Sequence, residues 1–248
     1  MMARFRGAHD PALHVWAIPL QASPGVIQTL RELISADEAA VAERMRVPEL
    51  RTAFIISHGI LRVLLSRYLE KSPEEICFRE SSKGKPSVFP PQPLQFNLSH
   101  SGMCALAGFA IGCEIGVDVE QVRTFSDMEA VAARFFCPDE VKDLARLSPQ
   151  LREQAFFRCW TRKEAYLKAT GEGLSSRLDD FQVSLCPDKP ACFLRLPSGS
   201  GPWSLYDIKA GTGYAAALAH RGPERPLKVT TIEEISPLIE GLEARSFR

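Results

Sequence analysis

The stretch Gly116-Val-Asp-Val-Glu120 indicates both how this chain folds and what chemistry it performs. Side chains alternate between the two faces of a strand, so Asp118 and Glu120 point to one face while the two valines pack on the other. Neighbouring carboxylates repel each other unless a cation or a proton lies between them. Such oxygen ligands suit Mg²⁺ or Mn²⁺, which bind a few carboxylates together with water and phosphate oxygens. The alternative interpretation is a solvated strand face that carries two acids.

Apolar segments before this strand extend it into a sheet. Residues 96–100, 104–110 and 113–120 read as strand segments separated by single glycines. A short apolar run does not decide between strand and helix, so 104–110 is also compatible with a buried helical turn. An earlier strand is expected over 14–18. The Pro- and Gly-containing residues 81–93 are expected to form a loop that leads into the sheet.

Helical patterns lie on both sides of this sheet. Ser35, followed three residues later by Glu38, has the spacing of a capping box and predicts a helix start. Residues 51–68 repeat apolar side chains at helical spacing, and residues 151–169 form a second long helix that ends at Gly171. Further elements are expected as a helical region at 126–147 that is broken near Cys137-Pro138, and as strands at 181–185, 192–196, 203–208 and 213–219.

The sequence therefore predicts an α/β (α+β) fold in which two halves each hold helices and a sheet. The change-over lies near residues 110–120, which divides the chain into an N-terminal half, 1–112, and a C-terminal half, 113–222, that carries the metal site. No sequence repeat supports a duplication. Residues 223–248 are rich in proline and charge and predict a C-terminal extension that is partly disordered up to a helix near 233–245.

The bulk composition disfavours several classes of partner. The 248 residues carry 30 Lys and Arg against 30 Asp and Glu, so no overall field attracts nucleic acid or an acidic membrane surface. No apolar run has the length of a signal-peptide core or a membrane span. Seven cysteines without a C-x-x-C pair disfavour a disulfide framework and a structural zinc site. We therefore expect a cytoplasmic protein that recognises anions only locally.

A second polar pattern lies on the predicted helix 151–169. The stretch Trp160-Thr-Arg-Lys-Glu-Ala-Tyr-Leu-Lys168 places Glu164 and Lys168 on one helix face at i,i+4. One interpretation is a surface salt bridge on an amphipathic helix. The other is a metal-bridged phosphate site, in which the carboxylate binds an ion and the ammonium neutralises phosphate oxygens.

A third polar cluster, Asn97-Leu-Ser-His-Ser-Gly102, interrupts the apolar strands. Ser99 and His100 face opposite ways in an extended chain, and no G-x-S-x-G elbow is present, so a Ser-His hydrolase is disfavoured. His100 is either a core residue with satisfied hydrogen bonds or part of a phosphate cradle of hydroxyl, imidazole and backbone N–H groups. Lys85 in its loop and Arg51 at a helix start are either solvated surface charges or further local cations.

Four motifs occur in order along the chain, namely Gly84-Lys-Pro86, Phe96-Asn-Leu-Ser-His-Ser-Gly102, Gly116-Val-Asp-Val-Glu120 and Trp160-Thr-Arg-Lys-Glu-Ala165. In order and spacing they resemble the Sfp-type 4'-phosphopantetheinyl transferases. The resemblance implies a monomer with two similar halves related by a pseudo-twofold, each a small sheet packed with helices, and the active site in the cleft between them. It implies that 4'-phosphopantetheine is transferred from coenzyme A to a serine of an acyl or peptidyl carrier protein, with release of 3',5'-adenosine bisphosphate. The carriers served by this family belong to polyketide, nonribosomal peptide or fatty acid biosynthesis.

The resemblance also implies roles for individual residues. The ligands of Mg²⁺ would be Asp118, Glu120 and Glu164. The residues that hold the coenzyme would be Arg51, Lys85, Ser99, His100 and Lys168, with Lys168 on the pyrophosphate and Lys85 beside the nucleotide. Glu164 and Lys168 would be the catalytic residues, and the general base would be Glu164 or a water molecule beside the metal.

One departure from the family pattern concerns the coenzyme's 3'-phosphate. Many members carry lysines for it on an early helix, whereas this chain has Glu38-Ala-Ala-Val-Ala42 there and leaves Arg44 and Arg46 as substitutes. Two alternative functions stay open at this stage. One is a metal-dependent phosphohydrolase that acts on a nucleotide with water as the nucleophile. The other is a module that binds a nucleotide or a carrier protein without catalysis.

Overall fold

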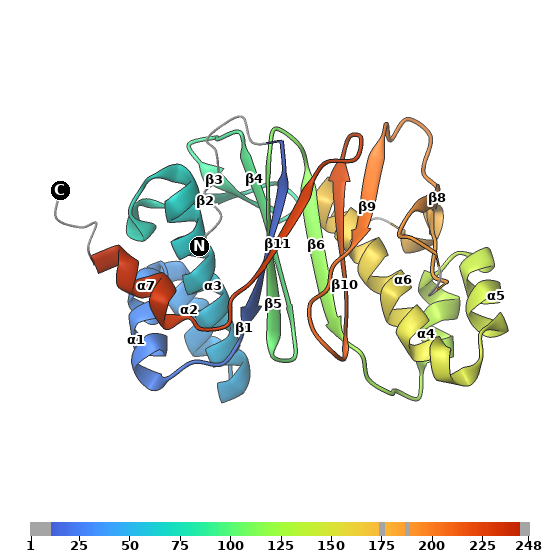
Figure 1. Ribbon diagram of the computed structural model, residues 1–248, viewed down its shortest axis with the longest axis horizontal. Coiled ribbons are helices and arrows are strands. Elements are labelled where there is room, and N and C mark those ends of the chain that lie inside the picture. Colours follow the sequence, from blue (N-terminus) through green and yellow to red (C-terminus); the bar gives the residue numbers. More distant parts are fainter. Residues whose placement is uncertain (1–10, 174–176, 187–188, 244–248) are drawn as a thin grey trace.

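The described part of the chain, residues 11–173, 177–186 and 189–243 of a computed structural model, repeats one order of elements (Figure 1). The first half runs β1 (Leu13–Pro19), α1 (Pro24–Leu33), α2 (Ala36–Arg44), α3 (Pro48–Leu69), β2 (Cys77–Glu80), β3 (Pro86–Phe89), β4 (Leu94–Ser101) and β5 (Cys104–Ile111). The second runs β6 (Ile115–Gln121), α4 (Met128–Phe135), α5 (Pro138–Arg146), α6 (Pro149–Thr170), β7 (Gln182–Val183), β8 (Phe193–Arg195), β9 (Trp203–Asp207) and β10 (Tyr214–Arg221). The strand β11 (Leu227–Thr231) and the helix α7 (Ser236–Glu243) follow. The predicted α+β fold with two similar halves is confirmed, and the exact boundaries of the halves stay predictions.

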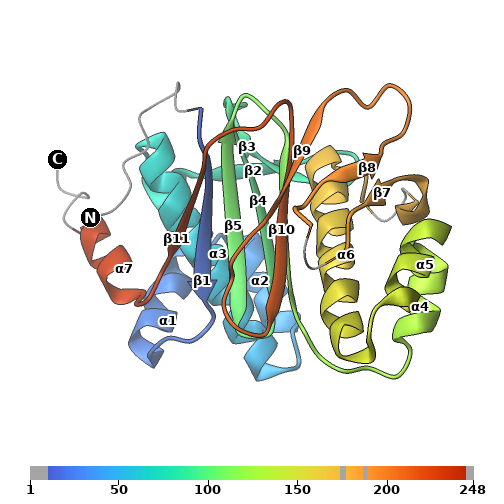
Figure 2. The ribbon, with the colours of Figure 1, turned by 45° about the vertical axis from the view of Figure 1, so that its right-hand side comes forward.

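The halves form four layers in the order helix, sheet, sheet, helix (Figures 1 and 2). In the described residues the first sheet has the order β11-β1-β5-β4 and the second has the order β6-β10-β9. The long helices α3 and α6 cover the two outer faces. A separate apolar cluster fills the space between the sheets, and it contains Val117 and Val119. The valines of the Gly-Val-Asp-Val-Glu stretch thus pack between the sheets, as the alternation predicts.

Most predicted elements are present, with shifts at their ends. Both long helices begin earlier than predicted, at Pro48 and Pro149, because a proline in the first turn has no N–H to leave unsatisfied. Residues 104–111 form a strand and not a helical turn. The segment predicted as a loop contains the strand β3, since Pro86 is its first residue in a two-stranded ribbon, where a missing N–H costs little.

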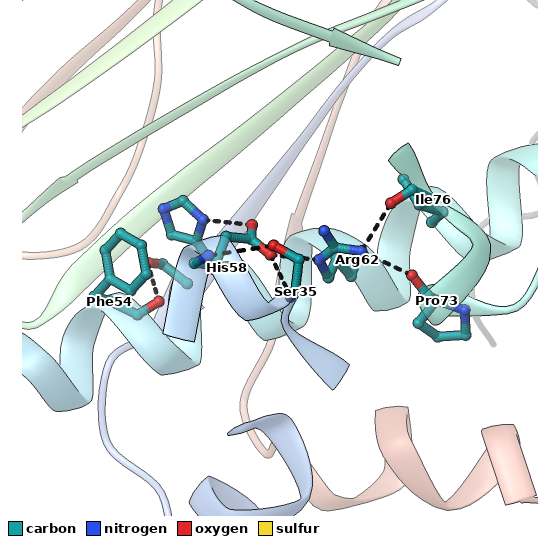
Figure 3. Close-up of polar contacts among 8 residues, drawn as sticks. Ser35, Phe54, His58, Arg62, Pro73 and Ile76 are labelled. Atoms are coloured by element: carbon teal, nitrogen blue, oxygen red, sulfur yellow. Dashed lines mark hydrogen bonds and ion pairs between the residues drawn. The ribbon is translucent and has the colours of Figure 1, made fainter. Parts of the chain in front are cut away.

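Among the described residues, each half contains an equivalent buried ion pair between a helix and the capping-box glutamate of the helix before it, which the sequence did not reveal as a repeat. In the first half Arg62 of α3 pairs with Glu38 of α2 and donates to two carbonyls near the short 3₁₀ helix Pro73–Glu75 (Figure 3). In the second half Lys163 of α6 pairs with Glu140 of α5 and likewise donates to two carbonyls at the 3₁₀ helix Leu178–Asp180. Both glutamates occupy the N3 position of a capping box.

Within the described residues 223–243 the chain forms the strand β11 and the helix α7, where the sequence predicts partial disorder up to a helix near 233–245. β11 pairs in parallel with β1, and α7 packs against α3, where Arg67 donates a 2.6 Å hydrogen bond to the carbonyl of Leu238. The helix expected near 233–245 is confirmed by α7, whereas the disorder expected before it is wrong, because the partner of β11 lies at the other end of the sequence, where a local pattern cannot register it. None of the described helices is long and apolar enough to span a membrane.

Candidate active site at the join of the two halves

The two sheets meet where β4 runs beside β6, and polar side chains link the two strands. From Asn97 to the end of β4, every second residue accepts a hydrogen bond from the backbone of β6. These pairs are Asn97 with Val117 N at 2.8 Å, Ser99 with Val119 N at 3.4 Å and Ser101 with Gln121 N at 3.1 Å. Side chains therefore satisfy backbone donors that would otherwise be left unpaired at this join.

Gly116 allows α6 to lie directly on β6. A Cβ atom at this position would overlap the backbone of Ala165 and Ala169, and it would lie 2.9 Å from the carbonyl carbon of Lys168. Because no side chain separates the helix from the strand, the polar face of α6 with Glu164 and Lys168 reaches the acids of β6. The first residue of the Gly-Val-Asp-Val-Glu stretch thus has a packing role.

Asp118, Lys168 and Ser99 form the centre of the site. The Lys168 ammonium lies 2.6 Å from Oδ1 of Asp118 and donates a 2.8 Å hydrogen bond to Oγ of Ser99, whose hydroxyl donates to the same Oδ1 at 2.9 Å. Asp118 is only 3% exposed, and its Oδ2 has no hydrogen-bond partner among the described residues. A buried carboxylate oxygen without a donor is a position where a cation would be stabilised.

Glu120 and Glu164 are the other two acids of this region. The Ser101 hydroxyl donates a 2.7 Å hydrogen bond to Glu120. Burial raises the pKa of all three carboxyl groups, and the negative charge of Asp118 raises the pKa of Glu120 and Glu164 further. The three acids are thus close enough to repel one another, as carboxylates short of positive charge do.

The chemistry of these acids fits a hard divalent cation, which prefers carboxylate oxygens. In the described residues, however, no three His, Cys, Asp or Glu side chains are arranged to hold a metal ion. The cation that now neutralises Asp118 is the ammonium of Lys168. The fit to Mg²⁺ therefore rests on the donor set and on the unpartnered Oδ2 of Asp118.

A cleft of about 270 Å³ opens beside this centre. The polar side chains among its lining residues include Lys83, Lys85, Asn97, Glu164 and Lys168. Three lysines around one small cleft form a site for an anionic ligand, although the chain as a whole carries no net charge.

Lys85 links the two halves at this cleft. Its Nζ donates to the carbonyls of Ile115, at 3.1 Å, and Ala169, at 2.6 Å, which belong to the second half. Burial lowers the pKa of Lys85 to about 8, against the opposing effect of Glu114. The Lys85 ammonium is therefore already hydrogen-bonded by the protein. The aliphatic part of its side chain packs on Gly171, where a Cβ atom would lie 3.1 Å from Cδ of Lys85.

Two predicted residues lie further from the centre. His100 is exposed on β4, and its pKa is lowered by desolvation and then by the positive charges of His58 and Lys168. Arg51 is exposed and donates a 2.7 Å hydrogen bond to the carbonyl of Met45 at the end of α2. None of the contacts described for Arg51 joins it to Asp118 or Lys168.

Sequence reasoning missed some of the residues that build the site. Ser101 and Asn97 occur in the quoted motif but received no role, although their alternation with Ser99 was the signal that all three face the same neighbouring strand.

A lysine-lined cleft beside buried carboxylates, at the join of two α+β halves, defines a protein with a site for an anionic ligand and a cation. Residues 114–219 match the family described as the 4'-phosphopantetheinyl transferase superfamily. The 4'-phosphopantetheinyl transferase HetI of Nostoc sp. (strain PCC 7120) is 39% identical over 213 residues, which cover 85% of this chain and 88% of that protein. The chain therefore belongs to the 4'-phosphopantetheinyl transferase superfamily, as the four motifs predict.

Two Bacillus proteins support the same assignment. The 4'-phosphopantetheinyl transferase psf-1 of Bacillus pumilus is 32% identical over 197 residues, covering 79% of this chain and 83% of that protein. The 4'-phosphopantetheinyl transferase Sfp of Bacillus subtilis (strain 168) is 30% identical over 178 residues, covering 72% of this chain and 78% of that protein.

Proposed function

We propose that this chain transfers the 4'-phosphopantetheine group of coenzyme A to a serine hydroxyl of an acyl or peptidyl carrier protein. The other product is 3',5'-adenosine bisphosphate. The observation that carries the proposal is the buried Asp118–Lys168–Ser99 cluster beside a lysine-lined cleft, in a chain 39% identical to a 4'-phosphopantetheinyl transferase. The cluster supplies both the negative charge for a cation and the positive charge for a phosphate.

The cleft supports binding of coenzyme A through its phosphates. The Lys168 side chain is 31% exposed. Its ammonium has three N–H donors, so it can donate to a pyrophosphate oxygen as well as to Asp118. Ser99, which accepts a hydrogen bond from Lys168, supplies a hydroxyl, and His100, the next residue of β4, is the candidate imidazole. Lys85 holds its loop at the mouth of the cleft, beside the nucleotide. Arg51 stays a candidate for the coenzyme's outer phosphate.

We propose Mg²⁺, with Mn²⁺ as a substitute, as the metal, and Asp118, Glu120 and Glu164 as its ligands. The unpartnered Oδ2 of Asp118 and the raised pKa values of the acids support this assignment. When bound, the ion stabilises negative charge on the phosphate oxygens in the transition state. The negative charge of the pyrophosphate would otherwise add to the repulsion among the three carboxylates.

The chain's own residues then perform a single displacement. The carrier serine oxygen attacks the β-phosphorus of coenzyme A and forms the new P–O bond. The bond to the oxygen of 3',5'-adenosine bisphosphate breaks, and its electron pair leaves with that product. Glu164 accepts the serine proton, for which a pKa raised by burial and by Asp118 makes it a stronger base. Lys168 stabilises the charge on the transferred phosphate.

We further propose that the protein acts as a monomer in the cytoplasm, on carriers of polyketide, nonribosomal peptide or fatty acid biosynthesis, and binds neither nucleic acid nor membrane. All seven cysteines are free, which suits a reducing compartment. The balance of 30 basic and 30 acidic residues gives no general attraction to polyanions.

Product release distinguishes this function from the alternatives. The protein is incubated with coenzyme A and Mg²⁺, with and without each of a panel of apo acyl and peptidyl carrier proteins, and 3',5'-adenosine bisphosphate is quantified by chromatography. We expect release only with a carrier, and loss of release when EDTA removes the metal. Release without any carrier would indicate a phosphohydrolase, and no release with any carrier would indicate a binding module.

A further inference from the structure

The edge of β6 that faces β4 obtains its hydrogen bonds from side chains of the first half. Asn97, Ser99 and Ser101 accept from backbone N–H groups at positions 117, 119 and 121. Lys85 extends this series by one step, because its ammonium donates to the carbonyl of Ile115 at 3.1 Å. The bonded positions of β6 thus recur at every second residue from 115 to 121, the spacing of backbone groups that point to one edge of a strand.

Lys85 bonds to α6 as well as to β6. The same ammonium donates to the carbonyl of Ala169 at 2.6 Å. Ala169 lies in the last turn of α6, where carbonyls have no N–H of the helix to accept from and where a positive charge is favourable. The two carbonyls that Lys85 holds therefore belong to the strand that carries Asp118 and to the helix that carries Lys168.

A tight turn between β2 and β3 presents Lys85 to the second half. The Ser81 hydroxyl accepts from the backbone N–H of Lys83 at 3.3 Å and of Lys85 at 3.1 Å, and the Ser81 N–H donates to the Lys85 carbonyl at 2.9 Å. Gly84 has a φ of 83°, which glycine adopts without strain. The backbone of Lys85 is therefore fixed before its side chain crosses to the second half.

The Lys85 ammonium is largely occupied by these bonds. Two of its three N–H groups are donated to the carbonyls of Ile115 and Ala169, which leaves at most one for a ligand. Lys83 of the same turn is exposed, and its ammonium makes no hydrogen bond among the described residues. The contacts of Lys85 are thus those of a link between elements, whereas Lys83 is free to meet an anion.

Ser99 makes a second link of the same kind. Its hydroxyl accepts from the backbone of Val119 in β6 and from the ammonium of Lys168 in α6, at 3.4 Å and 2.8 Å. The first half therefore holds α6 against β6 at two consecutive residues of the helix, Lys168 through Ser99 and Ala169 through Lys85. Two adjacent attachments restrict how far the helix can slide or tilt on the strand.

We propose that Lys85 is a positioning residue of the transfer reaction, which sets the distance between Asp118 and Lys168 by holding β6 and α6 at once. The proposal rests on the proposed function, because it assigns Lys85 a task in that reaction. It differs from a coenzyme contact, which would act on binding. A positioning residue acts on the rate of the chemical step, because a small displacement of reacting groups lowers that rate steeply.

The test separates the rate of transfer from the affinity for coenzyme A. Lys85→Met keeps an unbranched side chain without donors, and Lys85→Arg keeps donors for two carbonyls. Lys142→Met makes the same change at a 64% exposed side chain of α5 and is the control. We expect Lys85→Met to lower kcat roughly tenfold to hundredfold with the Kd for coenzyme A close to that of wild type, and Lys85→Arg to recover part of kcat. Lys142→Met should match wild type.

Both quantities decide the outcome. The kcat is the rate of 3',5'-adenosine bisphosphate release at saturating coenzyme A and carrier, and the Kd comes from isothermal titration without the carrier. A raised Kd with unchanged kcat would overturn the proposal and assign Lys85 to the coenzyme, and unchanged values of both would overturn it as well. Thermal melting checks folding, and Lys85→Gln replaces Lys85→Met if the latter does not fold.

Amide hydrogen exchange gives a readout that does not depend on turnover. We expect exchange in residues 115–121 and 164–171 to be faster in Lys85→Met than in wild type, with α1 unchanged, because these two segments lose their shared attachment. Equal exchange in the two proteins would contradict the proposal. Wild type that modifies no carrier contradicts the proposed function, and exchange then decides whether Lys85 holds the two elements. Wild type that transfers, beside Lys85→Met of unchanged kcat, contradicts only the role of Lys85.

Discussion

Replacing Gly116 by alanine tests whether the close contact of α6 with β6 builds the active site. The new Cβ would lie 2.9 Å from the carbonyl carbon of Lys168, against about 3.4 Å for an ordinary contact, and would overlap the backbone of Ala165 and Ala169 outright. The helix must therefore move away by at least about 0.5 Å, and by more to clear the two alanines. This displacement of α6 moves Lys168 away from Asp118, whose Oδ1 now lies 2.6 Å from the Lys168 ammonium.

The magnitude follows from general costs of overpacking. Forcing an extra methyl group into a packed contact costs roughly 1–3 kcal/mol, which for a chain of this size lowers the melting temperature by roughly 2–12 °C. A misplacement of about 1 Å among reacting groups costs roughly a hundredfold in rate. We expect a folded Gly116→Ala protein whose rate of transfer to the carrier falls by about that factor.

A matched control is available at Gly25, which is exposed in α1 and where a Cβ would meet nothing within 4 Å. Gly25→Ala is expected to leave transfer unchanged and to raise stability slightly, by about 0.5–1 kcal/mol. The assay combines a melting curve with the rate of product release. Full transfer activity in folded Gly116→Ala would refute the argument that this contact positions Lys168.

Three further predictions concern charged groups. Asp118→Ala should nearly abolish transfer and remain folded by circular dichroism, because it removes one of three mutually repelling acids; full activity or unfolding would contradict the metal assignment. Lys163→Met should lower the free energy of unfolding in urea by roughly 3–5 kcal/mol, because it leaves the Glu140 carboxylate, which is 1% exposed, without its cationic partner. A decrease below about 1 kcal/mol would contradict the role of this pair. Glu38 should contribute about 3 kcal/mol above pH 4.5 that is lost as pH falls through about 2, because its pKa in the folded protein lies near 2 against 4.5 unfolded. Urea unfolding of wild type from pH 6 to pH 2 should show this loss, and Glu38→Gln should lack it; equal pH dependence of the two would show that the carboxylate is not the source.

The sequence predicted the local parts of the site well. Alternation along β6 correctly put the two valines into the core and Asp118 on the opposite face, next to α6. The helical spacing of Glu164 and Lys168 was also correct. The partner of Lys168 was not apparent from spacing, because the ammonium pairs with Asp118 on another element and not with Glu164 one turn away. That pairing depends on the absence of a side chain at Gly116, which acts in three dimensions only.

The duplication of the fold was hidden for a related reason. The two halves perform the same structural task with different residues, since Arg62 in one is matched by Lys163 in the other, and the capping serine Ser35 is matched by Cys137. An arginine and a lysine can both supply the buried positive charge, so the repeated role leaves no repeated residue in the sequence. The strand β11 was missed because parallel pairing joins the two ends of the sequence, and no local pattern reports such a partner.

The most direct test of the proposed function locates the transferred group. An apo carrier protein is incubated with this protein, coenzyme A and Mg²⁺, digested, and sequenced by tandem mass spectrometry, beside a carrier in which the acceptor serine is replaced by alanine. The proposal predicts one 4'-phosphopantetheine group on that serine and none on the alanine variant. An unmodified carrier across the whole panel, or an equal modification of the alanine variant, would contradict it.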